Sequence, residues 1–252
     1  MVILYLLAAL GIMLGTYILL LILCSLLVST KREYDRYSKI YRWLLNSATA
    51  AVIKLLRIRV HISGMEKLPP EENILFVGNH ISNFDPILSW YAFRRWKIAF
   101  VSKSENFKVP FFGRIIRKCC FMPIDRENPR KAISTINRAA KLLKKQEVSI
   151  GVYPEGTRSK SGELLPFHNG VFKIAQKANA PIAVLSVNGT EHISKNIPLR
   201  KTDVYLDVLE VIPANEVAAT KTEILGQRIR EELEQNRKLR KRERNEHDLH
   251  TV

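Results

Sequence analysis

The sequence predicts an α/β fold, with a central, mostly parallel sheet flanked by helices and preceded by an N-terminal membrane-anchoring helical segment. A short, continuous apolar run at 74–77 has the composition of a strand that is buried on both faces, and residues 148–153, Val-Ser-Ile-Gly-Val-Tyr, read as another strand of this type. A third run at 181–187 is similar, and helical patterns separate the three. This alternation is typical of parallel sheets, in which ligands bind outside the carboxyl ends of the strands.

The remaining elements follow from hydrophobic periodicity. Helices are expected at 86–96, 129–146 and 170–177, and further strands at 98–102 and 204–211. Residues 57–63 alternate polar and apolar, which indicates an edge strand. The helix at 129–146 is basic and amphipathic, and its expected inward side chains are Ala132, Ile133, Ile136, Ala139, Ala140 and Leu143.

Composition limits the class of protein. A chain of 252 residues, 46% of them hydrophobic, suffices for one domain with an appendage. The three cysteines form no disulfide framework, because Cys24 lies in an apolar run and Cys119 and Cys120 are adjacent, which fits a reducing compartment or a site facing one. The six histidines show no metal-ligand spacing, so we expect neither a metal site nor a cofactor.

The formal net charge of +16 is concentrated in two segments. Residues 31–60 contain eight basic and two acidic side chains, and residues 94–145 contain fifteen basic and three acidic ones. A basic surface of this kind attracts nucleic acid, anionic lipid headgroups or an acidic soluble partner.

Residues 2–29 contain no charged side chain and are long enough, as a helix, to exceed the bilayer core of about 30 Å. They lack the basic start and the small-residue cleavage pattern of a signal peptide. Basic residues follow from Lys31 onward, so the positive-inside rule places the body of the protein on the cytoplasmic side. We expect a membrane anchor that either crosses the bilayer or lies in one leaflet.

Residues 38–57 form a second predicted helix with one apolar stripe, from which Arg42, Asn46 and Thr49 point away. Such a helix either packs on the domain or lies at the membrane interface. Its position beside the anchor and its basic flanks favour the interface.

The loop that follows the first buried strand contains the first candidate for chemistry. Gly78 and Asn79 end the apolar run, so His80 is expected at the carboxyl end of the strand. Asp85 reads as a helix N-cap, with Pro86 at the first helical position. The Asp85 carboxylate can reach one imidazole nitrogen and fix the tautomer, which leaves the other nitrogen as a general base for an alcohol. Alternatively, Asp85 is only a cap and His80 only a loop residue.

Residues 79–85, Asn-His-Ile-Ser-Asn-Phe-Asp, resemble the Asn-His-x-x-x-x-Asp box of the glycerolipid acyltransferases, the PlsC-type 1-acylglycerol-3-phosphate acyltransferase family. Residues 109–114, Val-Pro-Phe-Phe-Gly-Arg, resemble the family's segment between its first two boxes. Residues 121–126, Phe-Met-Pro-Ile-Asp-Arg, resemble the second box, in which a strand delivers an arginine to the polar head of the acceptor. Taken alone, Arg126 would be a surface arginine at a strand end.

Residues 154–159, Pro-Glu-Gly-Thr-Arg-Ser, follow the second buried strand and match the third box. Gly156 permits a positive φ or a close backbone approach, and Arg158 offers a planar fork suited to phosphate. Taken alone, this segment could be a turn with a solvated arginine. The fourth box is incomplete, because the run Pro181-Ile182-Ala183-Val184 lacks the second proline and could equally be a core strand.

Three boxes in order, over about residues 60–190, imply a reaction. The resemblance implies transfer of a fatty acyl group from acyl-CoA or acyl-carrier protein to the sn-2 hydroxyl of 1-acylglycerol 3-phosphate, a lysophosphatidic acid, which gives phosphatidic acid. His80 would be the general base and Asp85 its orienting partner. Lys103 or backbone N–H groups near His80 are candidates for the oxyanion. The residues expected to shape the acceptor site are Arg126, Glu155, Gly156, Thr157 and Arg158, with both arginines at the phosphate.

The same interpretation divides the chain into an anchor (1–58), a catalytic domain (59–220) and a charged C-terminal helix or tail (221–252). We expect that tail to be solvated or frayed rather than a nucleic-acid arm, and we expect membrane lipid but no nucleic acid as a partner. Two other interpretations stay open. One changes the acceptor to glycerol 3-phosphate or another lysophospholipid. The other is a non-catalytic, membrane-tethered basic module, in which His80→Ala would leave function intact.

Overall fold

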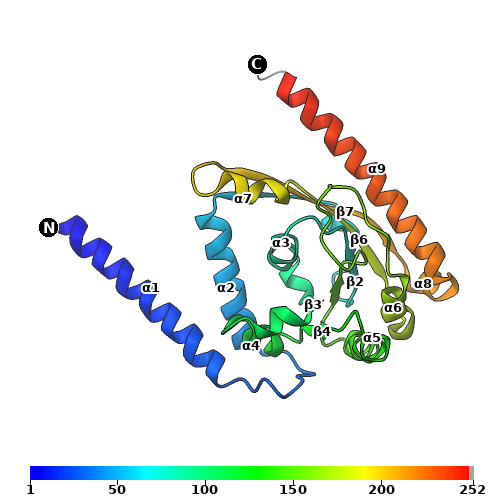
Figure 1. The fold of residues 1–252 in the computed structure, drawn as a ribbon, viewed down its shortest axis with the longest axis horizontal. Coiled ribbons are helices and arrows are strands. Elements are labelled where there is room, and N and C mark those ends of the chain that lie inside the picture. Colours follow the sequence, from blue (N-terminus) through cyan, green and yellow to red (C-terminus); the bar gives the residue numbers. More distant parts are fainter. Residues whose placement is uncertain (250–252) are drawn as a thin grey trace.

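The computed structural model describes residues 1–249, with the side chains of all of these except Ile3 and 243–249. The described residues form one seven-stranded sheet of order β1-β7-β6-β2-β5-β3-β4, in which neighbours are parallel except for the antiparallel pair β6 and β7 (Figure 1). The predicted α/β fold class is therefore confirmed. The strands are β1 (Ile58–Ser63), β2 (Leu75–Gly78), β3 (Ala99–Lys103), β4 (Met122–Ile124), β5 (Ile150–Val152), β6 (Ile182–Asn188) and β7 (Thr202–Ile212).

Helices flank this sheet. Helices α2 and α3 contact β1, α5 packs on β4 and α6, and α9 packs on β6 and β7. In Figure 1, α2 and α3 lie on one side of the strands, while α6, α8 and α9 lie on the other. The bounds are α1 (Val2–Leu26), α2 (Lys39–Leu55), α3 (Asp85–Ala92), α4 (Phe112–Lys118), α5 (Pro129–Lys144), α6 (Lys173–Ala178), α7 (Ile193–Asn196), α8 (Ala214–Ala219) and α9 (Thr222–Leu249).

Helix α1 is an apolar rod that stands apart from most of the domain (Figure 1). Residues Leu4–Leu26 have a mean hydropathy of 2.6, and an 18-residue apolar window of this stretch is not buried inside the molecule, although Ser25 near its end is buried. Within the described residues it is the one helix that is long and apolar enough to cross a membrane. Its exposed leucines and isoleucines suggest membrane anchoring.

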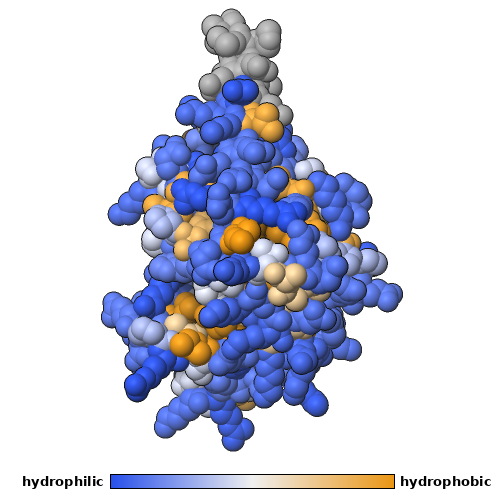
Figure 2. Space-filling model, turned by 90° about the vertical axis from the view of Figure 1, so that its right-hand side faces the viewer, coloured by the Kyte–Doolittle hydropathy of each residue, from blue (hydrophilic) through white to orange (hydrophobic). Residues whose placement is uncertain are grey.

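The opposite side of the molecule has a different surface. Figure 2 shows the face on the right of Figure 1, where α8 and α9 lie, and most of that face is hydrophilic, with small separate apolar patches. The two sides of the domain therefore suit different surroundings, since α1 is apolar and this face is polar.

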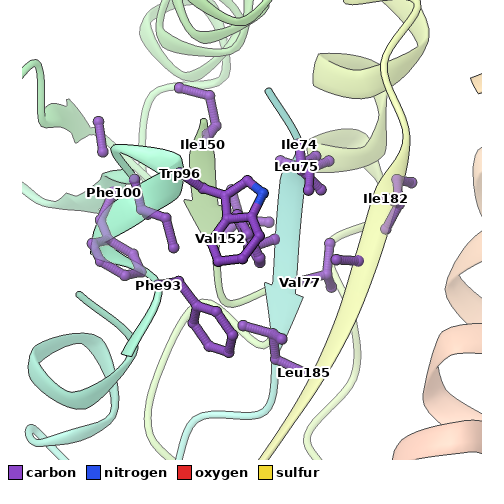
Figure 3. Packing of buried hydrophobic residues seen from close by; sticks show 14 of the residues in the cluster. Ile74, Leu75, Val77, Phe93, Trp96, Phe100, Ile150, Val152, Ile182 and Leu185 are labelled. Carbon is purple, nitrogen blue, oxygen red and sulfur yellow. The ribbon is translucent and has the colours of Figure 1, made fainter. Parts of the chain in front are cut away.

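The core forms around the three strands that the apolar runs predicted. Leu75 of β2 pairs with Ile150 of β5 and with Ile182 of β6, and all three side chains are fully buried. Aromatic side chains that follow α3 pack beside these strands (Figure 3), and Phe93 stacks on Phe76 with ring centroids 5.3 Å apart. Because β2 and β5 are parallel neighbours, the segments that follow them begin at the same edge of the sheet.

Helix α2 corrects the expected orientation of Arg42. This side chain is buried instead of pointing away, and it donates hydrogen bonds to the carbonyls of Lys97 and Ile98 at 3.2 and 3.1 Å. Its guanidinium lies over the ring of Trp90, 4.3 Å from the centroid. A buried arginine is tolerated here because carbonyl oxygens and an aromatic face replace water.

The same helix contacts α3 and α4 with its buried face and exposes four large apolar side chains, Ile40, Trp43, Val52 and Leu55. It therefore packs on the domain and still presents apolar surface to its surroundings. Its position at the membrane interface stays a prediction.

Two further expectations were wrong. Ile133 of α5 is 55% exposed, because the buried stripe of that helix consists of Ala139, Ala140, Leu142 and Leu143. Helix α9 is not a free tail: it packs on the sheet with buried leucines and an isoleucine, and Arg228 forms ion pairs with Glu210 and Glu216. Residues 250–252 of the predicted tail lie outside the described residues.

Candidate active site

The loop after β2 is tied to the neighbouring strand by Asn79. This buried amide donates to the Val187 carbonyl and accepts from the Val187 N–H, each at 2.8 Å. The side chain thereby replaces a backbone pair and holds the start of the loop against β6. His80 follows directly, so its backbone position is fixed at the carboxyl edge of the sheet.

His80 and Asp85 are in direct contact. The Nδ1 atom of His80 lies 2.8 Å from Oδ2 of Asp85, and the same oxygen accepts the backbone N–H groups of Ile81 and Ser82, each at 2.7 Å. The other oxygen, Oδ1, accepts the Thr190 hydroxyl at 2.5 Å. An oxygen of an ionised carboxylate can only accept hydrogen bonds. The imidazole nitrogen that contacts Oδ2, Nδ1, therefore carries the proton, and Nε2 is left with a lone pair.

This arrangement corrects the expected helix cap. The N-cap residue of α3 is Phe84, and Asp85 is the first helical residue, followed by Pro86. The Asp85 carboxylate turns back and accepts hydrogen bonds from the loop that precedes the helix, instead of from the first backbone N–H groups of the helix. It is completely buried, so its four hydrogen bonds replace water.

Tyr153 forms one wall for the imidazole. The rings of His80 and Tyr153 are stacked, with centroids 4.5 Å apart and an angle of 20° between the planes. Burial, and then the charge of Asp85, raise the pKa of Tyr153 well above its usual value, so the phenol stays neutral. With 17% of its side chain exposed, His80 is held on one face and remains accessible to a ligand.

Glu155 binds two backbone segments together. Its Oε1 atom accepts the His80 N–H at 2.7 Å and its Oε2 atom accepts the Leu165 N–H at 2.9 Å, while only 3% of the residue is exposed. Burial raises the pKa of this carboxyl. Both oxygens are therefore engaged by the backbone, and the structure gives Glu155 the task of positioning the His80 loop. Its predicted contact with an acceptor stays a prediction.

Two cavities flank the turn that contains the third predicted box. The smaller one, of about 160 Å³, is lined by Arg126, Gly156 and His168. Gly156 has a φ of +70°, and a Cβ atom there would lie 2.9 Å from the ring of His168, so both conformation and space require glycine. The larger cavity, of about 1130 Å³, contains Thr157 and Arg158. The two arginines thus face different cavities instead of one shared pocket.

The structure brings most of the predicted site residues to one edge of the sheet. His80 itself lines neither cavity formed by the described residues, but its neighbour Ile81 lines the larger one and Tyr153 lines the smaller one. Lys103 is exposed at the end of β3, opposite Ile124 of β4, and in the described part of the chain it also lines neither. Its role at an oxyanion stays a prediction.

Sequence reasoning missed two residues that hold the histidine–aspartate pair. Tyr153 is the last residue before the third box, and its place at the end of a buried strand was the signal that could have indicated it. Thr190 lies 105 positions from Asp85 and is the first residue of a short helical turn, Thr190–His192, so no local pattern indicated the contact. Among the described residues, no three His, Cys, Asp or Glu side chains are grouped as metal ligands.

Fold and site together define an α/β protein with a preorganised histidine–aspartate pair in the crevice at the carboxyl ends of parallel strands. The sequence profile of the acyltransferase family matches residues 59–188, which is more than half of the chain and includes this site. The chain belongs to the acyltransferase family.

Curated relatives carry a consistent name. A chloroplastic 1-acyl-sn-glycerol-3-phosphate acyltransferase of Brassica napus is 31% identical over 161 residues, covering 64% of this chain and 46% of the relative. The 1-acyl-sn-glycerol-3-phosphate acyltransferase of Salmonella typhimurium is 33% identical over 146 residues, covering 58% of each. The match therefore spans about half the length of these relatives.

A solved structure is similar over a longer range. The crystal structure of the 1-acyl-sn-glycerophosphate (LPA) acyltransferase PlsC from Thermotoga maritima superposes with a TM-score of 0.65 and covers 88% of both chains, at 24% sequence identity. At this level of identity the likeness establishes the shared fold.

Proposed function

We propose that this protein transfers a fatty acyl group from a thioester donor to the sn-2 hydroxyl of 1-acylglycerol 3-phosphate, which gives phosphatidic acid. The observation that carries the proposal is the His80–Asp85 pair, 2.8 Å apart at the carboxyl end of β2. Membership of the acyltransferase family and the names of the relatives from Brassica napus and Salmonella typhimurium support the choice of reaction and acceptor.

The chemistry needs one general base. The Nε2 atom of His80 takes the proton of the acceptor hydroxyl while its oxygen attacks the thioester carbonyl. The resulting tetrahedral intermediate collapses, the carbon–sulfur bond breaks, and the imidazolium returns the proton to the leaving thiolate. The products are an ester and a free thiol, and no acyl-enzyme is formed. Asp85 holds the imidazole in the required tautomer and stabilises its charged form.

The acceptor reaches this site from the membrane. Helix α1 anchors the protein, with the catalytic domain on the cytoplasmic side, because basic residues follow the apolar helix directly. Helix α2 adds exposed apolar side chains beside the anchor. The anchor thus comprises residues 1–58, and the catalytic domain begins at residue 59. Arg126, which lines the smaller cavity, binds the phosphate of the acceptor, whereas Arg158 faces the larger cavity on the other side of the Pro154–Ser159 turn.

The test is a comparison of acceptors with the wild-type protein in membranes. Labelled long-chain acyl-CoA or acyl-carrier protein is supplied with 1-acylglycerol 3-phosphate, with glycerol 3-phosphate or with a lysophospholipid that has a larger headgroup. We expect phosphatidic acid from the first acceptor at the highest rate. If only glycerol 3-phosphate is acylated, the proposed acyl transfer stands, but the acceptor is glycerol 3-phosphate instead of 1-acylglycerol 3-phosphate. A protein that acylates none of them with either donor would contradict the proposal.

A further inference from the structure

The larger cavity extends well beyond the catalytic loop. One part of its wall is formed by Ile81 and Ser159 beside His80, and another part by Arg237 and Lys241 of α9. Its volume of about 1130 Å³ slightly exceeds the range of about 300–1,000 Å³ that is typical of pockets for drug-sized ligands. A single glycerol phosphate headgroup would leave most of this space to water. The cavity therefore suits a larger ligand with one end at His80.

The wall of this cavity is strongly basic. Its lining contains seven Lys or Arg side chains and three Asp or Glu side chains. Arg59 is neutralised by Asp203 at 2.5 Å, but Lys160, Arg237 and Lys241 have no hydrogen-bond or ion-pair partner among the residues that the structure describes. Unpaired cations that converge on a concave surface are typical of sites for phosphate groups.

An aromatic pair lies on the same wall. The rings of His61 and Tyr205 are stacked, with centroids 4.9 Å apart, and both residues line the cavity. Half of the His61 side chain is exposed, so the pair offers a flat surface to a further ring. Stacking on such a surface, together with neighbouring cations, is the usual way in which proteins hold a nucleobase and its phosphates.

The location of the cavity argues for a ligand that arrives from water. Helix α9 lies on the side of the domain opposite α1, and the face around α9 is mostly hydrophilic (Figures 1 and 2). A lipid headgroup held at the membrane anchor would approach from the other side. An acidic carrier protein would dock on a convex or flat surface, whereas these cations line a hollow.

We propose that the cavity between α9, the β1–β7 edge and the His80 loop binds the 3′-phosphorylated adenosine diphosphate part of coenzyme A. Lys160, Arg237 and Lys241 bind its phosphates, and the His61–Tyr205 pair supports its adenine. The thioester end then extends toward Ile81 and His80. This inference rests on the proposed acyl transfer for the identity of the nucleotide, and it selects acyl-CoA rather than acyl-carrier protein as the donor.

The first test compares two donors that share the same thioester. Acyl-CoA carries the nucleotide and acyl-pantetheine lacks it. In the double variant Arg237→Gln/Lys241→Gln, we expect the KM for acyl-CoA to rise about tenfold or more, because charge-assisted bonds to phosphate are lost. The rate with acyl-pantetheine should not change. Lys238→Gln, an exposed lysine of α9 that does not line the cavity, is the matched control and should resemble the wild type with both donors.

The second test measures binding without catalysis. Adenosine 3′,5′-bisphosphate is titrated calorimetrically into the full-length wild-type protein, the double variant and the control in the same detergent. Binding that is lost only in the double variant supports the site even if no acyl transfer is found, in which case the proposed function alone fails. A wild-type protein that does not bind the nucleotide, or a double variant with an unchanged KM for acyl-CoA, would overturn the inference. A double variant whose acyl transfer is slowed only with acyl-carrier protein as the donor would also overturn it.

Discussion

The His80 loop and the α9 wall of the larger cavity lie at the same edge of the sheet but are built in opposite ways. In the loop, the buried carboxylates are completely engaged: Asp85 accepts four hydrogen bonds and Glu155 accepts two. Along the wall, Arg237 and Lys241 have no ion-pair partner among the described residues. The loop is therefore organised before any ligand binds, whereas the wall leaves charges for a ligand to neutralise.

The two regions also differ in their position relative to the family profile. The profile match ends at residue 188, so it includes the His80 loop and excludes α9. The contrast suggests that a rigid, shared site performs the chemistry and that a separate surface recognises the water-soluble substrate. Substitutions in the loop should therefore lower kcat, and substitutions on the wall should raise the KM for acyl-CoA.

Among the substitutions that leave His80 in place, the largest effect is expected from Asp85→Asn. An amide in place of the carboxylate presents a donor where His80, Ile81 and Ser82 already donate, so the imidazole loses the partner that fixes its tautomer. We predict that kcat falls about 10²- to 10⁴-fold, with much smaller changes in either KM. Steady-state assays on protein whose folding is verified by circular dichroism would measure this. A kcat within threefold of the wild type would contradict the assigned role of the pair.

The next largest effects are expected from the two arginines that face different cavities. Arg126→Gln should raise the KM for 1-acylglycerol 3-phosphate and Arg158→Gln the KM for acyl-CoA, each about 10- to 100-fold, because a charged contact to phosphate is removed. The KM for acyl-CoA should change little in Arg126→Gln. If Arg158→Gln raises the KM for 1-acylglycerol 3-phosphate instead, Arg158 belongs to the acceptor site, and the boundary between the two substrates must be moved.

Thr190→Val tests the support of the pair from a distant part of the chain. The substitution keeps the shape of the side chain and removes the hydroxyl that donates to Asp85 at 2.5 Å. We expect the free energy of unfolding to fall by about 1–3 kcal/mol, since a buried charged acceptor loses a donor, and kcat to fall with it. Thr190→Ser retains the hydroxyl and should recover most of both quantities. Denaturant titration would measure the free energy of unfolding. An unchanged value in Thr190→Val would show that this hydrogen bond contributes little to stability.

The smallest predicted effect concerns pH. Burial raises the folded-state pKa of Glu155 above 4.5, so the stability contributed by this group is full below about pH 4.5 and is lost as the pH rises through the folded pKa. Glu155→Gln lacks this titration. The wild type should therefore lose stability relative to the variant as the pH rises through that window, by at most about 1.4 kcal/mol per pH unit. The measurement is the free energy of unfolding in urea, plotted against pH for the wild type and for Glu155→Gln. Parallel curves for the two proteins would contradict the raised pKa of Glu155.

The sequence predicted the parts of the fold that depend on local pattern. The mainly apolar segments at 74–77, 148–153 and 181–187 correspond to β2, β5 and β6, because a strand that is buried on both faces consists mostly of apolar residues. It did not predict that β7 runs antiparallel to β6, since strand direction is set by chain connections and not by composition. The packing of α9 was missed because its many charged residues hide three buried apolar side chains, Leu225, Ile229 and Leu233.

The site was predictable to a similar extent. His80 and Asp85 are five positions apart, so their contact could be expected from one loop and one helix start. The contact between Thr190 and Asp85 depends on where β6 ends relative to β2, which no local pattern encodes. Arg42 was placed on the wrong side of α2 because a charged side chain was expected in solvent, while two backbone carbonyls and Trp90 provide its partners inside.

The central claim is that His80 removes a proton from the acceptor hydroxyl during acyl transfer. The direct measurement is the rate at which membranes that contain equal amounts of wild-type or His80→Ala protein convert labelled acyl-CoA and 1-acylglycerol 3-phosphate to phosphatidic acid. The account predicts rapid product formation with the wild type and none above the background of empty membranes with the variant. Equal rates for the two proteins would contradict it.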